Sequence, residues 1–183
     1  GDLFRITNIY PNTIVQVETE DTTMLFSIDL PGSFKQLAEL KKPAKWTSTN
    51  PVQIGQYMMR IGGDEDNLNY DPDLVILPPA EQFVKSMIFQ TVGNEAVNPF
   101  QFDGYKVSII AELEALNTLK LDDKYVIGLD QNMVNNVFPN SSRRWTKLIL
   151  TPGVHNITCQ SGSFSGITYG YGKADSYSLT LGS

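Results

Sequence analysis

The residues best suited to bind a ligand lie in one polar stretch, from Asp64 to Asp73. This stretch concentrates carboxylate and amide oxygens, which are the hard ligands that Ca²⁺ prefers. Its spacing departs from the EF-hand loop, because the glycine and the terminal glutamate of that loop are not at their required offsets. Two interpretations remain open: a calcium site formed by Asp64, Asp66 and Asp71, or an acidic surface loop that binds no metal. No other cofactor is expected.

The same stretch is the candidate binding loop. Tyr70 lies within it, and an exposed tyrosine offers a partner both apolar area and a polar hydroxyl group. We therefore expect Tyr70, with Asp64 and Asp66, to contact a macromolecular partner. Four further tyrosines are expected to divide between exposed contacts and core packing: Tyr57, Tyr169, Tyr171 and Tyr177.

Catalytic chemistry finds little support in the sequence. His155 is the single histidine and Cys159 the single cysteine, whereas a catalytic triad needs a nucleophile and an orienting acid around its base. The segment Gly162–Gly166 superficially matches a nucleophile elbow but lacks the helix that follows one. Cys159 ends an alternating run, so we expect a buried and inert thiol. No catalytic residue is predicted, and a zinc site would need more ligands than these two.

Two segments match the N-glycosylation pattern, in which a serine or threonine stands two residues after an asparagine. Asn140 follows Pro139 in a polar stretch, which is typical of an exposed loop. Asn156 lies in a strand-like run and could carry a sugar only if its side of the strand faces solvent. Both are glycosylation candidates, with Asn140 the better one.

Charge and hydropathy exclude several classes of partner. The net charge is −6 and the isoelectric point is about 4.7, whereas nucleic-acid binding needs a basic surface to neutralise phosphates. We interpret the one tight basic pair, Arg143 with Arg144, as part of an ordinary solvent-exposed face. No apolar run approaches the roughly 20 residues of a membrane-spanning helix, so no membrane insertion is expected. Because the chain opens directly on a strand-like pattern, we interpret it as a fragment of a larger protein.

Short β-prone runs separated by turn residues recur along the whole chain. Residues 13–18, 24–28 and 145–150 show the period-2 alternation of half-buried strands. This pattern predicts an all-β, antiparallel, β-sandwich-type architecture, with two packed β-units over residues 1–92 and 93–183, or one composite domain. A crossing between the two halves is expected at residues 91–104, where glycine and proline interrupt the pattern.

Four segments carry more specific expectations. Residues 34–40 have helical spacing but are too few to decide between helix and strand. Residues 111–119 are assigned to strand extension and a turn, and no helix longer than about three turns is expected. Leu121–Asp123 predicts a hairpin turn that leads into a strand over 125–127. The glycines within 164–172 predict a bulge or the close approach of another backbone.

Several short motifs of turn residues and aromatic residues follow one another from end to end of the chain. They are Gly1–Ile6, Asn12–Thr13, Thr49–Val52, Gln56–Met58, Asp71–Asp73, Leu77–Gln82, Pro152–His155, Tyr169–Gly172 and Asp175–Tyr177. In order and spacing they resemble the N-terminal domain of IgGFc-binding proteins. The resemblance implies an extracellular β-rich module of the kind found in mucus-associated, nematode and bacterial surface proteins. No motif for immunoglobulin contact is available to carry over.

The leading functional hypothesis is therefore an extracellular or cell-surface adhesion module that binds a protein or glycoprotein partner and catalyses nothing. Its loops would act from a rigid β scaffold. The alternative is a structural spacer or a self-assembling subunit, which a strand-edge contact with a second chain would favour. A carbohydrate-active enzyme is the remote alternative, and it would need two carboxylates facing each other across a cleft.

Overall fold

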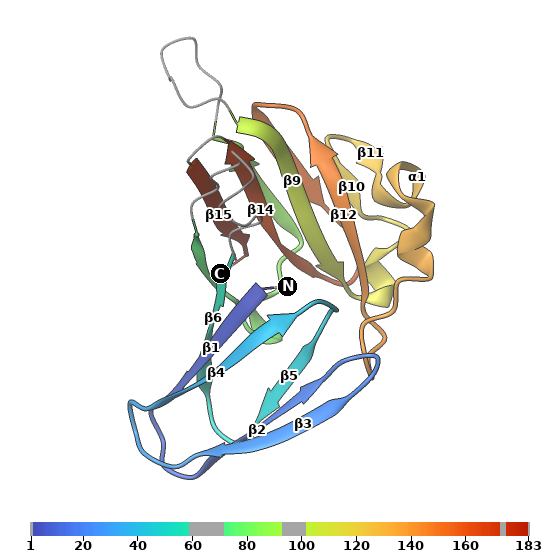
Figure 1. The fold of residues 1–183 in the computed structure, drawn as a ribbon. Coiled ribbons are helices and arrows are strands. Elements are labelled where there is room, and N and C mark those ends of the chain that lie inside the picture. Colours follow the sequence, from blue (N-terminus) through green and yellow to red (C-terminus); the bar gives the residue numbers. More distant parts are fainter. Residues whose placement is uncertain (1, 59–71, 93–101, 173–174, 183) are drawn as a thin grey trace. The chain divides into compact units, whose positions relative to one another are not determined.

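The computed structural model describes residues 2–58, 72–92, 102–172 and 175–182. Within these residues almost every regular element is a β-strand, and every strand pair is antiparallel (Figure 1). The one α-helix described, α1 (Val126–Leu129), has four residues, and no described helix is long and apolar enough to span a bilayer. The predicted all-β, sandwich-type fold without long helices is confirmed.

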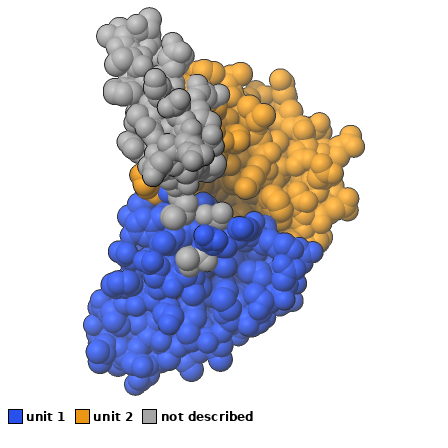
Figure 2. Space-filling view, in the orientation of Figure 1, with its two compact units in different colours: residues 1–59, 74–77, 138–141 blue, residues 60–73, 78–137, 142–183 orange. Residues whose placement is uncertain are grey.

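The chain divides into two compact units, which Figure 2 shows in different colours. Unit 1 takes its described residues from 1–59, 74–77 and 138–141, and unit 2 from 60–73, 78–137 and 142–183. The chain therefore changes unit several times. Residues 78–92, which the sequence pattern grouped with the first half, pack within unit 2.

Unit 1 is a sandwich of two sheets with strand orders β4-β1-β6-β7 and β3-β2-β5. Its strands are β1 (Asp2–Asn8), β2 (Thr13–Glu18), β3 (Thr23–Ile28), β4 (Phe34–Leu40), β5 (Lys45–Ser48), β6 (Val52–Tyr57) and β7 (Leu74–Ile76). Alternation along β1 and β2 turns one side of each strand inward, so Ile6, Val15 and Val17 are fully buried. These residues join Phe4 and Ile28 in one small core.

Unit 2 also consists of two sheets, with strand orders β12-β9-β14-β15 and β11-β10-β13-β8. The strands are β8 (Ser86–Gln90), β9 (Phe102–Ala111), β10 (Lys120–Leu121), β11 (Lys124–Tyr125), β12 (Arg144–Leu150), β13 (Val154–Thr158), β14 (Phe164–Gly172) and β15 (Asp175–Leu181). Short 3₁₀ turns span Ala80–Gln82, Leu113–Ala115 and Gln131–Val134. A larger core surrounds Val107, Ile109 and Phe164, all of them fully buried.

Two segments resolve ambiguities in the sequence. Residues 34–40 form a strand, β4, because pairing with β1 outweighs a weak helical pattern. A register shift interrupts that pairing, and Glu39 has a φ of 58°. Residues 111–119 end β9 and continue into a 3₁₀ turn, as expected. The strand predicted over 125–127 ends at Tyr125, since Val126 begins α1.

Two local predictions of backbone geometry are confirmed. Asp122 and Asp123 both have positive φ, 50° and 64°, between the paired residues Leu121 and Lys124. This is the type I′ turn that two-residue hairpins favour. Gly166 on β14 lies so close to β9 that a Cβ atom would stand 2.3 Å from the carbonyl oxygen of Ser108, and the β14–β9 register shifts near Gly172.

Candidate recognition surface

The predicted calcium and binding residues Asp64, Asp66, Tyr70 and Asp71 lie outside the described residues. Of the acidic stretch, Asp73 is described, and its carboxylate accepts a hydrogen bond of 2.6 Å from Ser178 Oγ. The described part of the chain contains no cluster of three or more histidine, cysteine, aspartate or glutamate side chains that could hold a metal.

His155 is buried and held from both sides. Its Nδ1 lies 2.7 Å from Asp122 Oδ2, and its Nε2 lies 2.8 Å from the carbonyl oxygen of Thr151. Both neighbouring atoms are oxygen atoms, so both ring nitrogens of His155 are engaged within the protein. A catalytic base needs a free lone pair, and this arrangement uses His155 to tie β13 to the β10–β11 turn.

Asp122 completes this brace. Its Oδ1 accepts a hydrogen bond of 3.0 Å from the backbone N–H of Asn156. Burial disfavours the charged carboxylate, but the hydrogen bonds from His155 and Asn156 outweigh burial and lower the pKa of Asp122. The side chain is 44% exposed, so solvent screens much of this stabilisation.

Cys159 is buried, as predicted, and burial raises the pKa of its thiol. It borders a surface hollow of about 160 Å³ that the β10–β11 hairpin and residues 158–160 line. Drug-sized ligands occupy pockets of roughly 300–1,000 Å³. The hollow has one carboxylate in its lining, that of Asp123, so it lacks the two facing carboxylates that glycoside hydrolysis requires.

The two glycosylation candidates have different surroundings. Asn140 has a φ of 43° in an exposed turn, and its side-chain amide donates a hydrogen bond to Glu18. That bond lowers the pKa of Glu18, and Lys45, 3.3 Å from the same carboxylate, acts in the same direction. Asn156 is exposed on β13, so the solvent-facing geometry that its glycosylation requires is present.

An exposed apolar surface that the sequence analysis missed lies on unit 1. The turn at residues 9–12 joins β1 to β2, and the turn at residues 29–33 joins β3 to β4; we call them together the two-turn tip. Both turns lie at the same end of the unit (Figure 1). They are hydrogen-bonded to each other's flanks, from Gly32 N–H to Asn8 O at 2.8 Å and from Asn12 N–H to Asp29 O at 3.2 Å.

Each turn has a defined conformation. In the second turn Ser33 N–H donates to Leu30 O at 3.1 Å, and Gly32 has a φ of 76°. With proline at the second position and glycine at the third, this is a type II turn, and the Pro31-Gly32 pair marks it in the sequence. In the first turn Asn12 has a φ of 53°, which asparagine tolerates better than most residues.

A fully buried asparagine fixes the tip from below. The Asn8 amide donates hydrogen bonds to Tyr10 O at 2.6 Å and to Ile28 O at 2.9 Å, so it links the first turn to the end of β3. Thr13 Oγ1 donates a second hydrogen bond, of 2.7 Å, to Tyr10 O. The Oδ1 atom of Asn8 is buried without a partner among the described residues. An unpartnered buried oxygen is costly, and the two hydrogen bonds that the amide donates offset this cost.

The braced turns display apolar side chains to solvent. Ile9 is 68% exposed, Leu30 70% and Tyr10 47%, and Pro11 and Pro31 are exposed beside them. Phe34, at the start of β4, is also exposed, with the Arg5 guanidinium 4.6 Å from its ring centroid. Turns are normally polar, and contiguous exposed apolar groups mark interaction sites. The signal was present in the sequence as Ile-Tyr-Pro and Leu-Pro-Gly, where large apolar residues stand inside turn motifs.

The tyrosines singled out from the sequence are mostly packed. Tyr177 is buried in the core of unit 2, whereas Tyr57, Tyr169 and Tyr171 are half-buried. Tyr169 and Tyr171 share one face of β14, with ring centroids 6.3 Å apart, and Tyr171 contacts Lys106. Of the tyrosines on the described surface, Tyr10 and Tyr125 are the most exposed.

The fold is that of a β-sandwich module, and hydrogen bonds hold an exposed apolar tip at one end of unit 1. The family model described as IgGFc binding protein matches residues 1–170, which span most of both units. The chain belongs to this family, and membership indicates a binding module with a protein partner. Comparison with curated proteins and with solved structures finds no significant match.

Proposed function

We propose that this chain is an extracellular or cell-surface module that binds a protein or glycoprotein partner through the two-turn tip and catalyses no reaction. The observation that carries the proposal is the exposure of Ile9, Tyr10 and Leu30 on two turns that a buried asparagine holds in place. Family membership supports a protein partner, and the family description names IgG Fc as the first ligand to test.

The chemistry of the tip fits a protein surface. Two aliphatic side chains, one tyrosine and two prolines lie together without a charged residue between Ile9 and Asn12. Aromatic and aliphatic groups of this kind form the desolvated centre of protein interfaces, while polar groups form the rim. Asp29 and Asn12 stand at the edge of the tip and would belong to such a rim.

The bracing also lowers the expected cost of binding. Ordering a loop on association costs free energy, so a preorganised loop binds more tightly for the same contacts. Six hydrogen bonds restrain the two turns before any partner arrives: two are donated by Asn8 and one each by Asn12, Thr13, Gly32 and Ser33. The turns are therefore suited to rigid docking.

The experiment compares matched double variants. Ile9→Ser with Leu30→Ser removes the apolar tip, and Ile149→Ser with Leu179→Ser removes equally exposed apolar residues from unit 2. Each protein is immobilised and tested against purified IgG Fc and against native extracellular fluid. We expect the tip variant to bind the captured partner at least about tenfold more weakly, since loss of interface anchors costs more than 1 kcal/mol each. A partner that the tip variant retains and the unit 2 variant loses would refute the assignment.

The absence of catalysis has its own test. A screen of glycan and peptide substrates should give no turnover with the wild-type chain. Reproducible hydrolysis that disappears on substitution of one carboxylate would overturn the proposal and favour the carbohydrate-active alternative.

Calcium and glycosylation complete the proposal as separate hypotheses. If Asp64, Asp66 and Asp71 bind Ca²⁺, millimolar calcium should raise the melting temperature, because a ligand of the native state stabilises it. Equal melting curves with calcium and with chelator would show that the acidic stretch binds no calcium. Mass spectrometry of the secreted chain tests glycan occupancy at Asn140 and Asn156, both of which are exposed, and Asn140 is the better candidate.

A further inference from the structure

Each of the four described sheets ends in two edge strands, and β3 in unit 1 and β8 in unit 2 are among them. An edge strand leaves half of its backbone N–H and C=O groups unpaired, and these groups form a template for another strand. Natural proteins usually protect such edges with charge, proline, bulges or short length. An edge that has none of these features stays open to pairing with another strand.

The outward-facing groups of β3 follow from its neighbours. Thr49 N–H donates to Ile14 O at 3.0 Å, so the backbone groups of Ile14 point toward β5. Because bonding direction alternates along an antiparallel strand, Val15 and Val17 then point toward β3 and bond Phe26 and Met24. The backbone groups of Thr23, Leu25 and Ser27 are left facing the open edge.

The same reasoning applies to β8. Thr91 N–H donates to Gly153 O at 3.0 Å and Cys159 N–H donates to Lys85 O at 2.8 Å, so these odd-numbered residues of the β13 segment point toward β8. His155 and Ile157 then bond Phe89 and Met87. The backbone groups of Ser86, Ile88 and Gln90 face the open edge.

The two edges have the same pattern and the same lack of protection. β3 reads Thr-Met-Leu-Phe-Ser over residues 23–27, and β8 reads Ser-Met-Ile-Phe-Gln over residues 86–90, without a charge or a proline in either run. At the centre of each run Leu25 is 67% exposed and Ile88 is 70% exposed.

The other described edges have protection of the usual kinds: β5 and β11 begin with Lys45 and Lys124, and β7 has only three residues. β12 carries Arg144 and Lys147, and β4 carries Lys35, Glu39 and a register shift. On β15 the hydroxyl of Ser178 bonds the carboxylate of Asp73, which places a charge beside the strand. The contrast sets β3 and β8 apart as edges that remain available for pairing.

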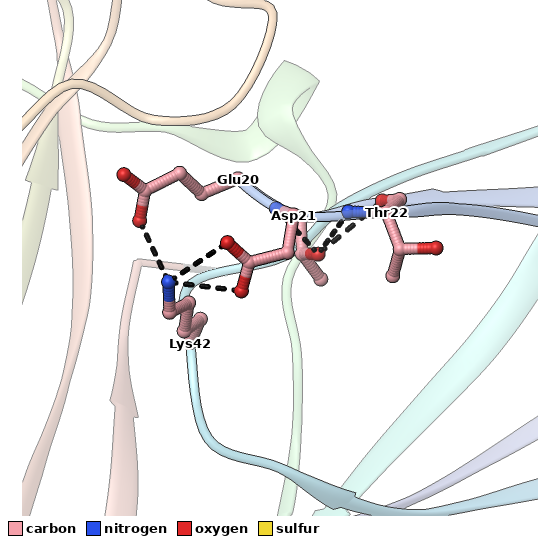
Figure 3. Close-up of polar contacts among 5 residues, drawn as sticks. Glu20, Asp21, Thr22 and Lys42 are labelled. Atoms are coloured by element: carbon pink, nitrogen blue, oxygen red, sulfur yellow. Dashed lines mark hydrogen bonds and ion pairs between the residues drawn. The ribbon is translucent and has the colours of Figure 1, made fainter.

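The turn beside β3 has a defined conformation, with exposed ion pairs on its surface. Figure 3 shows Lys42 between the carboxylates of Glu20 and Asp21, at 3.1 Å and 2.9 Å, at the turn between β2 and β3. Thr19 N–H donates to Thr22 O at 2.8 Å and closes that turn.

Charge decides which strand fits the β3 edge. Asp21 and Asp29 flank β3, so antiparallel pairing of two β3 strands centred on Leu25 would oppose Asp29 of one copy to Asp21 of the other. Like charges in that position are destabilising. In the matching pairing with β8, residue 29 stands opposite residue 84, and the exposed Lys85 of the second copy lies one position from Asp29. The β8 strand is therefore complementary to β3 in both pattern and charge.

We propose that β3 of one copy of this chain pairs antiparallel with β8 of a second copy, with Leu25 opposite Ile88 of the second copy. In this register the outward backbone groups of both strands meet, and Met24 and Phe26 lie beside Phe89 and Met87 of the second copy. The contact joins two different surfaces, so it generates a closed ring or an open chain of subunits. It is independent of the binding role proposed for the two-turn tip.

Directed cross-linking tests the register. Leu25→Cys and Ile88→Cys chains are mixed under mild oxidation; in a bonded antiparallel pair the Cα atoms are about 5.5 Å apart, within the range of a disulfide. We expect a covalent dimer in the mixture and none with either variant alone. The control mixes Leu25→Cys with Ile149→Cys, which lies 82% exposed on the charged edge β12. Cys159 is buried in every variant and is not expected to react.

Three results would overturn the proposal. One is a mixture of Leu25→Cys and Ile88→Cys chains that gives no more cross-link than the control. Another is efficient cross-linking of Leu25→Cys alone, which would show self-pairing of β3. The third is a wild-type chain that stays monomeric in sedimentation velocity at every concentration tested.

A charge placed on the edge provides a second measurement. Leu25→Lys and Ile88→Lys should each weaken association by about tenfold or more, which corresponds to about 1.4 kcal/mol, while Ile149→Lys leaves association unchanged. Thermal melting confirms that each variant is folded, as expected for positions so exposed. Unchanged association of both edge variants would contradict the proposal.

Discussion

Unit 1 and unit 2 share an architecture of two antiparallel sheets but use their apolar residues differently. The core of unit 1 rests on Phe4, Ile6, Val15, Val17 and Ile28, whereas the core of unit 2 is much larger. Both units expose large apolar residues, such as Ile9, Leu25 and Leu30 in unit 1 and Ile88, Ile149 and Val154 in unit 2. A small core gives a small margin of stability, so unit 1 is expected to tolerate fewer destabilising changes than unit 2.

The two units also differ in their buried polar braces. Unit 1 holds the two-turn tip with the uncharged amide of Asn8, and unit 2 ties β13 to a hairpin turn with His155 and Asp122. The first brace holds two exposed turns in place, and the second joins β13 to the β10–β11 turn. The Asn8 brace lies directly under the two-turn tip, and this is why the proposed recognition surface is placed on unit 1.

The largest expected effects come from the two cores. Ile6→Ala in unit 1 and Ile109→Ala in unit 2 each remove a fully buried side chain, and such changes cost roughly 2–5 kcal/mol. Because the core of unit 1 is smaller, Ile6→Ala should bring that unit closer to unfolding than Ile109→Ala brings unit 2.

The two tryptophans separate these effects. Trp46 lies in unit 1 and Trp145 in unit 2, so Trp46→Phe and Trp145→Phe backgrounds each leave one reporter. Urea titration should show the Ile6→Ala shift mainly at Trp46 and the Ile109→Ala shift mainly at Trp145. Equal shifts at both reporters would mean that the units unfold as one body.

The next effect concerns the brace under the tip. Asn8→Ala removes two hydrogen bonds and leaves two carbonyl groups with fewer partners, so it should destabilise unit 1 by about 1–3 kcal/mol. The control Asn50→Ala removes one bond of 3.3 Å, from the Asn50 amide to Thr13 Oγ1, and should cost less. Urea midpoints measured at Trp46 check the order of the two variants. An Asn8→Ala variant with the same urea midpoint as the wild type would show that Asn8 does not hold the two-turn tip in place.

Acid should weaken both units through different carboxylates. The folded-state pKa is lowered for Glu18 in unit 1 and for Asp122 in unit 2. Each group therefore contributes stability that is complete above its unfolded pKa, near 4, and is lost as pH falls through the lower folded value. Glu18→Gln should flatten the acid dependence at Trp46, and Asp122→Asn that at Trp145. A steep loss of stability between pH 6 and pH 5 that either variant abolishes would contradict these directions.

The smallest effect is expected at the β2–β3 turn. Lys42 bridges two exposed carboxylates, and hydrogen bonds to Asp21 and Glu20 raise its pKa. Exposed ion pairs add little to stability, so Lys42→Ala should leave the melting temperature almost unchanged. A clear loss would show that this turn matters more to the β3 edge than its exposure indicates.

The regular part of the fold was predictable from the sequence because alternation and turn residues act locally. The β10–β11 turn at Asp122 and Asp123 and the close approach at Gly166 both follow from backbone rules that one segment expresses by itself. Residues 34–40 were ambiguous because pairing with β1, which decides their conformation, is a long-range effect. The change from strand to helix at Val126 carried no local signal.

The candidate surface was harder to predict, since it depends on two turns that are twenty residues apart. Ile9 and Leu30 stand inside turn motifs, but only pairing of the flanking strands brings those turns together. Reasoning from oxygen ligands instead favoured Asp64, Asp66 and Asp71, and reasoning from exposed aromatic residues favoured Tyr70. All four lie outside the described residues. Likewise, the similar residue patterns of β3 and β8 are visible in the sequence. Their positions at the edges of two sheets depend on strand pairing and are not.

The most direct test of the account maps where a partner touches the chain. Hydrogen–deuterium exchange is measured on the free protein and on its complex with the partner captured in the binding experiment. The account predicts new protection of residues 9–12 and 29–33, with the sheets of unit 2 unchanged. Protection confined to unit 2, with the two-turn tip exchanging as in the free protein, would contradict it.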